Sequence, residues 1–143
     1  MDDNRTDKNQ LKHLEFIQSV VTRMNANSFQ SKGWAITIFS ALLAIYAGSG
    51  GNRLFLVVSV APALLFWFLD AYYLQQERKF RGVYNDAAGL SKEETRIKIR
   101  LFEMPIQHYT KGKYSYWSVF FSRTIFPLYA LMIGLVVLGS IFL

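Results

Sequence analysis

The sequence predicts an all-α membrane protein with three transmembrane helices, an N-terminal amphipathic helix and a short cytosolic helical segment. The chain of 143 residues contains three apolar segments, at residues 34–48, 54–74 and 124–143. The last two are about 20 residues long, which is the length of helix that crosses a bilayer core. Hydrophobic residues make up 52% of the chain, more than a soluble domain of this size can bury. We therefore expect a single membrane domain over residues 1–143.

The basic residues are distributed unevenly between the segments that connect the predicted spans. Of the 16 Lys and Arg residues, five precede Trp34, one lies in the turn at residues 49–53, and ten lie between Arg78 and Arg123. Basic residues concentrate on the cytoplasmic side of membrane proteins. We therefore expect the N-terminus and the segment 75–123 inside the cell, and the turn and the C-terminus outside.

Residues 1–33 are predicted to form a cytosolic amphipathic helix. Apolar side chains recur at steps of three and four residues from Leu11 to Met24, which is the period of one helix face. The helix is expected to continue into the first span, and Gly33 would allow a bend there. Its apolar face would pack against another cytosolic segment or a neighbouring subunit, and a position on the membrane surface is the alternative.

The first span, residues 34–48, carries small side chains at a spacing of four residues. This stripe consists of Ser40, Ala44 and Gly48. Small residues allow the backbones of membrane helices to approach closely. The stripe is therefore the predicted oligomer interface, and close packing against the second span is an equal alternative.

The second span, residues 54–74, follows a glycine-rich turn that makes the first two spans an antiparallel hairpin. Pro62 lies within this span, where a kink is expected. The aromatic residues at 66–73 indicate a belt at the inner membrane interface. The helix is expected to continue beyond the membrane to residue 84, because no helix breaker precedes Gly82.

The segment between the second and third spans is predicted to contain one short helix. Ser91 and Glu94 have the spacing of a capping box at its start, and Pro105 would end it after Met104. A mixture of basic and aromatic residues at 107–117 then leads to the third span.

Two carboxylates of the second helix, Asp70 and Glu77, form the candidate ion path. Ionisable groups at membrane depth usually face protein or water. The two residues are two helical turns apart on one face, so that stacked rings of carboxylates in an oligomer would favour cations. The alternative interpretation is that Asp70 is structural and pairs with Arg78, Arg123 or the end of the first helix.

Basic and aromatic side chains also suggest a ligand site in the segment before the third span. Cationic groups beside aromatic rings suit nucleotides and single-stranded nucleic acids. The same composition is also produced by positive-inside topology and interfacial anchoring. The candidate ligand-binding residues are Arg96, Lys98, Arg100, His108, Tyr109, Lys111, Lys113 and Tyr114.

No motif of a catalytic or metal site occurs in the sequence. There are no cysteines, and the two histidines, His13 and His108, have no companion at the spacing of metal ligands. Neither a phosphate-binding glycine loop nor a nucleophile elbow is present. We therefore expect no enzymatic activity, no metal and no cofactor.

Two stretches, residues 14–34 and 66–81, resemble a class of small bacterial membrane proteins encoded in anti-phage loci. The class is that of the SLATT-like membrane effectors, which are associated with nucleotide-signal systems. Within it, the chain is most similar to the membrane effector of the Hailong system, which pairs with a nucleotidyltransferase. The resemblance covers about residues 14–85.

The resemblance implies a homo-oligomeric ion channel in the bacterial inner membrane, which we expect to be a tetramer. A nucleotide or oligonucleotide from a partner nucleotidyltransferase would gate it, and its opening would depolarise the membrane and stop growth during infection. The C-terminus would then be periplasmic. Two other functions stay open: a non-conducting membrane anchor or adaptor for a soluble partner, and a small proton-coupled transporter.

Overall fold

The protein is all-helical in a computed structural model that describes residues 3–142, with side chains described for residues 5–141. No strand occurs in that range, so the predicted all-α class is confirmed. The elements are α1 (Asp3–Gly48), α2 (Arg53–Ala87), the short 3-10 helices η1 (Glu93–Thr95), η2 (Ile106–His108) and η3 (Gly112–Tyr114), α3 (Tyr116–Phe120) and α4 (Phe126–Phe142).

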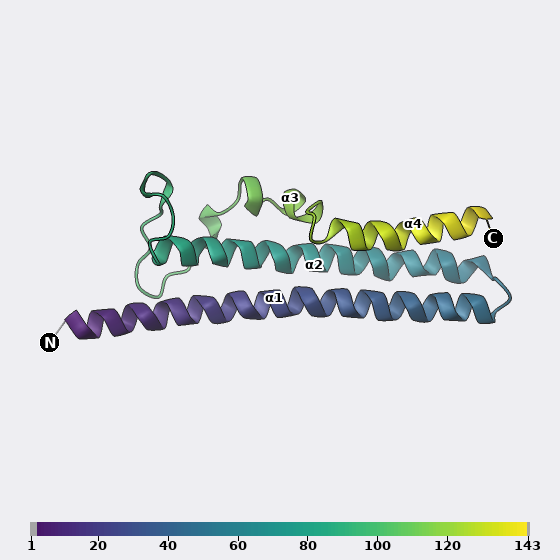
Figure 1. Ribbon diagram of the computed structural model, residues 1–143, viewed down its shortest axis with the longest axis horizontal. Helices are drawn as coiled ribbons and strands as arrows, with labels where there is room; N and C mark the ends of the chain where they lie inside the picture. The colour runs from purple at the N-terminus through teal and green to yellow at the C-terminus, as the bar shows by residue number, and fades with distance from the viewer. Residues whose placement is uncertain (1–2, 143) are drawn as a thin grey trace.

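Helices α1 and α2 form the predicted antiparallel hairpin (Figure 1). The predicted amphipathic helix and first span are one continuous helix of 46 residues, which Gly33 does not interrupt. In the turn, Gly50 and Gly51 adopt φ angles of 70° and 84°, which favour glycine. The Asn52 side chain then caps α2 by accepting a hydrogen bond from the Leu54 backbone N–H at 3.0 Å.

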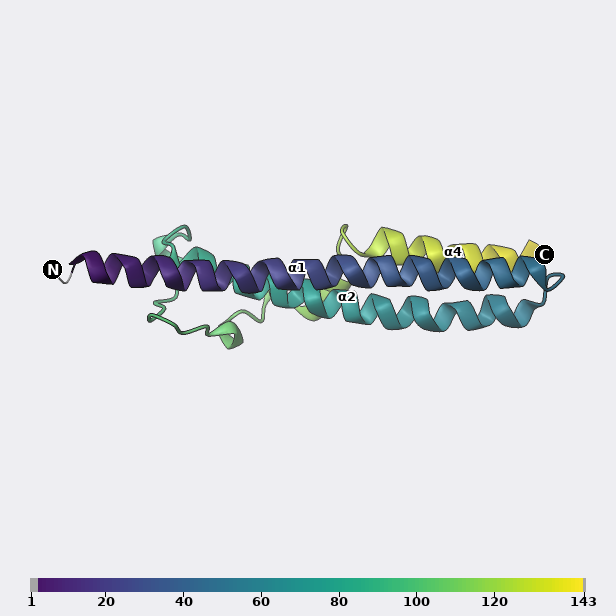
Figure 2. The same ribbon diagram turned by 90° about the horizontal axis from the view of Figure 1, so that it is seen from below.

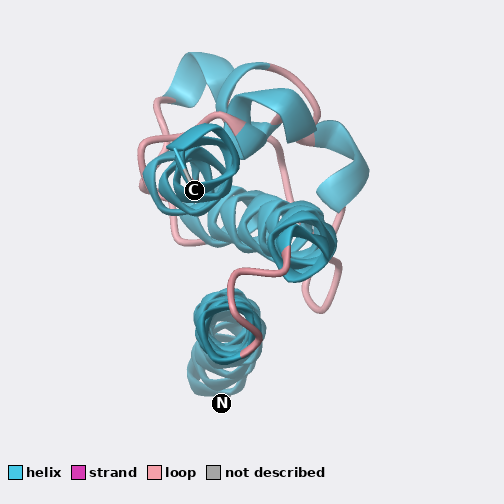
Figure 3. Ribbon diagram, turned by 90° about the vertical axis from the view of Figure 1, so that its right-hand side faces the viewer, coloured by secondary structure: helices cyan, strands magenta, loops and turns pink. Residues whose placement is uncertain are grey.

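Of the three long helices, α2 is the one that contacts both of the others, α1 and α4 (Figures 1 and 3). The end of α4 lies near the turn that joins α1 and α2, and the start of α1 lies at the opposite end of the molecule (Figure 2). We call this opposite end the base. Two ends of the bundle are thereby defined without reference to a membrane.

The main hydrophobic core lies where α2 meets α1, α3 and α4. Trp67 of α2 is stacked against the rings of Phe120 and Tyr129, with centroid separations of 4.3 Å and 5.7 Å. Its indole N–H donates to the Phe120 carbonyl oxygen at 3.1 Å. This side chain therefore attaches the C-terminal part of the chain to the hairpin.

A second, smaller core lies at the base. Ile17 and Val21 of α1 pack there with Val83 of α2 and with Tyr109 of the connecting segment, residues 88–115. The connecting segment thus folds back onto the hairpin and contributes to its packing.

The prediction of a short helix after Ser91 is wrong. Only the turn η1 forms, the residue before it is Lys92, and no side chain caps it. Ile97 and Ile99 are instead half-buried against the base, while Lys98 and Arg100 between and after them are exposed. An alternation of buried and exposed side chains with a period of two residues is typical of extended chain. Burial of the two isoleucines therefore favours extended chain over the predicted helix.

The third predicted span is shorter than expected, since α4 begins at Phe126 and has 17 residues. By length and composition, two helices of the described range, α1 and α2, can cross a membrane, whereas α4 is apolar but shorter. Leu143, the last residue of the predicted span, lies outside the described residues. Three membrane crossings therefore stay a prediction.

Candidate functional site

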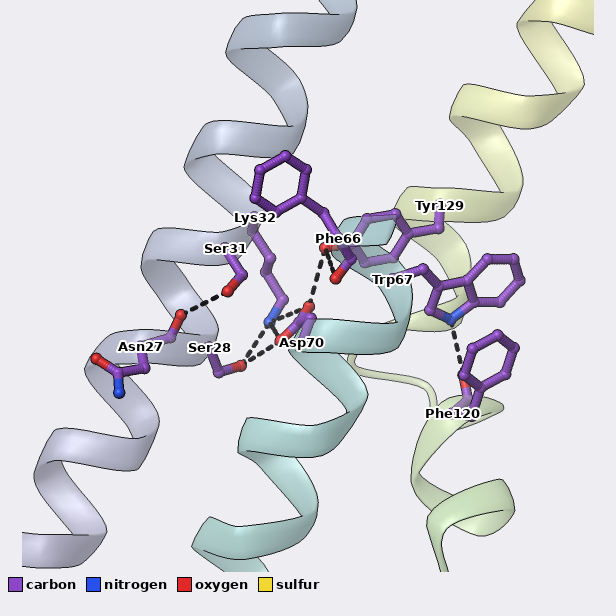
Figure 4. Close-up of polar contacts among 9 residues, drawn as sticks. All are labelled: Asn27, Ser28, Ser31, Lys32, Phe66, Trp67, Asp70, Phe120 and Tyr129. Atoms are coloured by element: carbon purple, nitrogen blue, oxygen red, sulfur yellow. Dashed lines mark hydrogen bonds and ion pairs between the residues drawn. The ribbon is translucent and has the colours of Figure 1, made fainter. Parts of the chain in front are cut away.

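Asp70 lies on the middle helix and is fully buried, with an exposed fraction of 0%. The Lys32 ammonium of α1 approaches both of its oxygens, at 2.9 Å from Oδ1 and 2.8 Å from Oδ2 (Figure 4). About 26 Å of helix separates Asp70 from Arg53 at the start of α2. This distance is slightly less than the thickness of a bilayer core, which is about 30 Å.

Two hydroxyl groups complete the surroundings of this carboxylate. Ser28 donates to Asp70 Oδ1 and accepts a hydrogen bond from Lys32 at 2.9 Å. Tyr129 of α4 has its hydroxyl 3.3 Å from Asp70 Oδ2 and 3.2 Å from the Phe66 carbonyl oxygen. We call Ser28, Lys32, Asp70 and Tyr129 the Asp70 cluster. It joins all three long helices at one carboxylate (Figure 4).

The position of each donor follows from helix geometry. Ser28 and Lys32 are one turn apart on the same face of α1, and that face meets α2. The side chain of Lys32 is 20% exposed, so its aliphatic stem crosses the packed surface while its ammonium pairs with Asp70. Of the partners considered for Asp70, Arg78 instead donates to the Lys113 carbonyl oxygen, and Arg123 is exposed. The partner found, Lys32, stands at the end of the predicted amphipathic helix.

Glu77, the second candidate for the ion path, is also buried, with 6% of its surface exposed. Arg81, one turn later on α2, donates to its Oε1 from Nε at 2.8 Å and also from Nη2. Within a single chain, both candidate carboxylates are therefore paired with a cation.

Two of the predicted ligand-binding residues anchor the connecting segment, and of these Tyr109 is buried and Tyr114 is half-buried. The Tyr109 hydroxyl donates to Asp86 Oδ2 at 2.6 Å, and the Tyr114 carbonyl accepts from Gln75 at 2.9 Å. Burial, and then the hydrogen bond to the Asp86 carboxylate, raise the pKa of Tyr109 above its usual value. Both rings lie against Gly82, where an added Cβ would come within 2.7 Å of Tyr109.

The basic residues of the predicted ligand set do not form one cluster. Arg96 donates to the carbonyl oxygens of Gly89 and Ser91, at 2.9 Å and 3.0 Å. Lys113 lies 5.1 Å from the centroid of the Tyr114 ring, within the range of a cation–π interaction. The remaining basic residues, Lys98, Arg100 and Lys111, are exposed.

A pocket of about 490 Å³ lies between the connecting segment and the end of α2. Its size falls within the usual range of small-molecule sites. From the predicted set it is lined by His108, Tyr109, Lys113 and Tyr114, and further polar groups come from Asn85, Asp86 and Lys92. Lys98 lines a neighbouring pocket of about 280 Å³ together with His108. Arg96, Arg100 and Lys111 line neither.

The small-residue stripe of α1 does not contact α2. Ser40, Ala44 and Gly48 are exposed, whereas Ala35 and Phe39 form the buried face of that part of the hairpin. The alternative in which the stripe packs against the second span is therefore wrong. Its use as an oligomer interface stays a prediction.

Sequence reasoning considered the end of the first helix as a partner of Asp70 without naming Lys32, and it missed Ser28 and Tyr129. One signal could have found Lys32: the inner ends of the two spans of an antiparallel hairpin lie side by side, so a lysine at one end faces a carboxylate at the other. Tyr129 gave no such signal, because the register of α4 against α2 depends on packing.

Comparisons of the chain with protein-family models, with characterised proteins and with solved structures found no match. In the described range, no group of three or more His, Asp or Glu side chains could hold a metal ion. The features of the molecule that bear on function are therefore the Asp70 cluster, the pocket at the base and the arrangement of the helices.

Proposed function

We propose that this protein is a homo-oligomeric ion channel of the bacterial inner membrane, gated by a nucleotide or oligonucleotide on its cytoplasmic side. Its opening would depolarise the membrane and arrest growth during phage infection. The observation that carries the proposal is the Asp70 cluster, a charged pair buried between apolar helices. Ionisable groups at membrane depth are costly to insert, and they usually mark ion or proton pathways.

Conduction requires several copies of the chain. In the end-on view, α1 and α4 pack on different sides of α2 (Figure 3). Three packed helices of a single chain do not enclose an aqueous path. The exposed stripe of Ser40, Ala44 and Gly48 on α1 is suited to close contact with a neighbouring subunit. We assign it to the subunit interface, with the tetramer as the proposed assembly.

The arrangement of the Asp70 cluster corresponds to a closed conformation in this proposal. Asp70 is inaccessible to water, and Lys32 neutralises its charge. Opening would exchange Lys32 for water or a permeating cation, which requires α1 to move relative to α2. A carboxylate released in this way favours cations in a pore.

The pocket at the base is the proposed ligand site. Lys92 and Lys113 are placed to meet phosphate oxygens, and the Tyr114 ring offers a surface on which a base can stack. Asp86 of α2 also lines the pocket, so a ligand there contacts both the connecting segment and the hairpin. Ligand binding could thereby bias the packing of α1 on α2.

The test is ion flux through liposomes that contain the purified protein. We expect the wild type to conduct, with a conductance that short single-stranded DNA or nucleoside triphosphates change. Asp70→Asn should alter cation selectivity or the open fraction, because it removes the charge of the proposed path. Glu94→Gln is the matched control, since Glu94 is exposed in the connecting segment. Absence of conductance from the wild type under every ligand condition would refute the channel.

A non-conducting membrane anchor is the second candidate. It is favoured by the burial of Asp70 and its pairing with Lys32, because the same arrangement is expected of an ion pair that only stabilises the hairpin. An anchor would retain its biological activity in Asp70→Asn as long as the variant folds. The channel would not.

A further inference from the structure

The chain bends sharply between α3 and α4, and the two sides of this bend differ in exposure. We call residues 116–126 the elbow. Its inner side, which includes Phe120, is buried against Trp67. On its outer side Trp117, Phe121 and Phe126 are 59%, 60% and 42% exposed.

The three exposed rings form one continuous surface. The centroids of Trp117 and Phe121 are 6.4 Å apart, and those of Phe121 and Phe126 are 6.1 Å apart. A contiguous exposed aromatic surface marks a site of interaction with a membrane or another molecule. Tryptophan is enriched at the level of the lipid headgroups in particular.

Hydrogen bonds fix the level of the elbow along the hairpin. The Tyr116 hydroxyl donates to the Phe68 carbonyl oxygen at 3.0 Å, and the Trp67 indole donates to Phe120 at 3.1 Å. A layer of about 30 Å measured along α2 from Arg53 ends close to Tyr73. The elbow therefore lies within about two helical turns of the inner boundary of that layer.

Two carbonyl groups of the bend are hydrogen-bonded within the protein. The Ser122 carbonyl oxygen accepts hydrogen bonds from the N–H groups of Ile125 and Phe126, at 3.1 Å and 2.9 Å. The Phe120 carbonyl oxygen is the one bound by Trp67. Non-helical backbone at the edge of a bilayer is tolerated where protein groups bind it in this way.

Arg123 lies at the centre of the elbow and is exposed. Within the described part of the chain its guanidinium has no hydrogen bond or ion pair, unlike Arg78, Arg81 and Arg96. A guanidinium binds phosphate oxygens through two parallel N–H groups. It therefore provides an anion-binding group near the inner boundary of the layer, from where a long side chain can extend toward the phospholipid phosphates.

We propose that the elbow binds the headgroup of an anionic phospholipid in the inner leaflet. Arg123 binds the phosphate, and Trp117, Phe121 and Phe126 lie between the headgroup and the start of the acyl chains. The exposed Lys111 and Lys113, which precede the elbow, add to the attraction for a negatively charged leaflet. This site does not depend on whether the protein conducts ions.

The test uses the full chain in phosphatidylcholine vesicles that contain a brominated phospholipid, because bromine quenches nearby tryptophans. The fluorescence of Trp117 is obtained by subtracting the fluorescence of the Trp117→Phe variant from that of the wild type, and we call this difference the Trp117 signal. Brominated phosphatidylglycerol should quench this signal with about fivefold higher relative affinity than brominated phosphatidylcholine, the ratio that about 1 kcal/mol per basic residue gives. Trp34, which is 53% exposed on α1, reports independently that the protein is in the bilayer.

Three variants make the site falsifiable. Arg123→Gln should remove most of the preference for phosphatidylglycerol, Arg123→Lys should retain part of it, and Arg53→Gln at the opposite end of α2 should leave it unchanged. Circular dichroism establishes that each variant is folded.

Two results would overturn the proposal. In the first, lipid bromine quenches Trp34 but the Trp117→Phe substitution leaves the quenching unchanged, so the elbow does not face lipid. In the second, the wild type and Arg123→Gln show the same preference between the two lipids, so Arg123 binds no headgroup.

Discussion

At the scale of single residues, the Asp70 carboxylate connects the three long helices. It forms an ion pair with Lys32 and accepts a hydrogen bond from Ser28, both of α1, and it lies within hydrogen-bond distance of the Tyr129 hydroxyl of α4. In apolar surroundings a carboxylate is stable only when its charge is paired and its oxygens are hydrogen-bonded. The stability of the whole bundle should therefore be sensitive to each partner.

Removing the positive charge should destabilise the protein more than removing the pair. Lys32→Met leaves Asp70 buried without compensation and should lower the free energy of unfolding by about 3–5 kcal/mol. The double variant Lys32→Met/Asp70→Leu should recover most of this loss, because no buried charge remains. Thermal unfolding in detergent, followed by circular dichroism, measures both effects. Lys12→Met on the exposed face of α1 is the control, and an equal loss there would contradict the prediction.

Tyr109 should make the stability depend on pH in the alkaline range. Burial and Asp86 raise its folded-state pKa above the usual 10.0. The unfolded state therefore ionises first, so this contribution is present below about pH 10 and is lost as the pH rises further. Tyr109→Phe should lose less stability than the wild type between pH 9 and 11. If the unfolding temperatures of the wild type and of Tyr109→Phe fell in parallel as the pH rises, this account would be contradicted.

At the scale of elements, the connecting segment is held to both helices of the hairpin. The His13 ring of α1 is hydrogen-bonded to the Glu103 carbonyl oxygen at 3.1 Å, and the Tyr109 hydroxyl donates to Asp86 of α2. Ile97 takes part as well, since its backbone N–H donates to Asp86 at 3.2 Å. The segment lacks long helices of its own, and it is ordered through these contacts with the hairpin.

Gly82 determines whether the connecting segment can pack on α2. A methyl group in Gly82→Ala would lie 2.7 Å from the Tyr109 ring and 2.8 Å from the Tyr114 hydroxyl. We expect a loss of about 1–3 kcal/mol and faster proteolysis within residues 88–115. Gly33→Ala is the matched control, because no atom lies within 4 Å of the added methyl group. It should stabilise α1 by about 0.5–1 kcal/mol, and a similar loss in both variants would argue against the packing explanation.

At the scale of the whole molecule, charge and helix arrangement point to the same orientation. The base carries the connecting segment, which holds six of the 16 Lys and Arg residues, whereas Arg53 alone lies beside the turn that joins α1 and α2. The end of α4 lies at the turn end (Figure 1). The positive-inside rule then predicts a cytoplasmic base and a periplasmic turn.

Single cysteines can test this orientation, because the chain has none of its own. In intact cells, a membrane-impermeant maleimide should label Ser49→Cys, which is exposed in the turn. Lys92→Cys, exposed at the base, should be labelled only after the inner membrane is made permeable. Labelling of both positions in intact cells, or of neither, would contradict the predicted topology.

Parts of the fold could be predicted because they depend on local sequence. The hairpin follows from two apolar helices and the glycine-rich turn between them. The helix predicted after Ser91 was wrong for a reason that is not local: the apparent capping box favours a helix, whereas the alternation from Ile97 to Arg100 favours extended chain. Sequence alone could not decide between them, because the isoleucines are buried only once the hairpin is present.

The sequence by itself therefore determined the helical class, the hairpin and the concentration of basic residues at one end. These features depend on hydrophobic periodicity, chain length and charge, each of which is read along a single segment. Only the tertiary structure decided which side chains meet Asp70, that the stripe of α1 stays exposed, and that the chain bends before α4. Those outcomes depend on how helices distant in sequence pack together. The free-energy cost of burying the Asp70 charge is offset only where Lys32, Ser28 and Tyr129 converge on it.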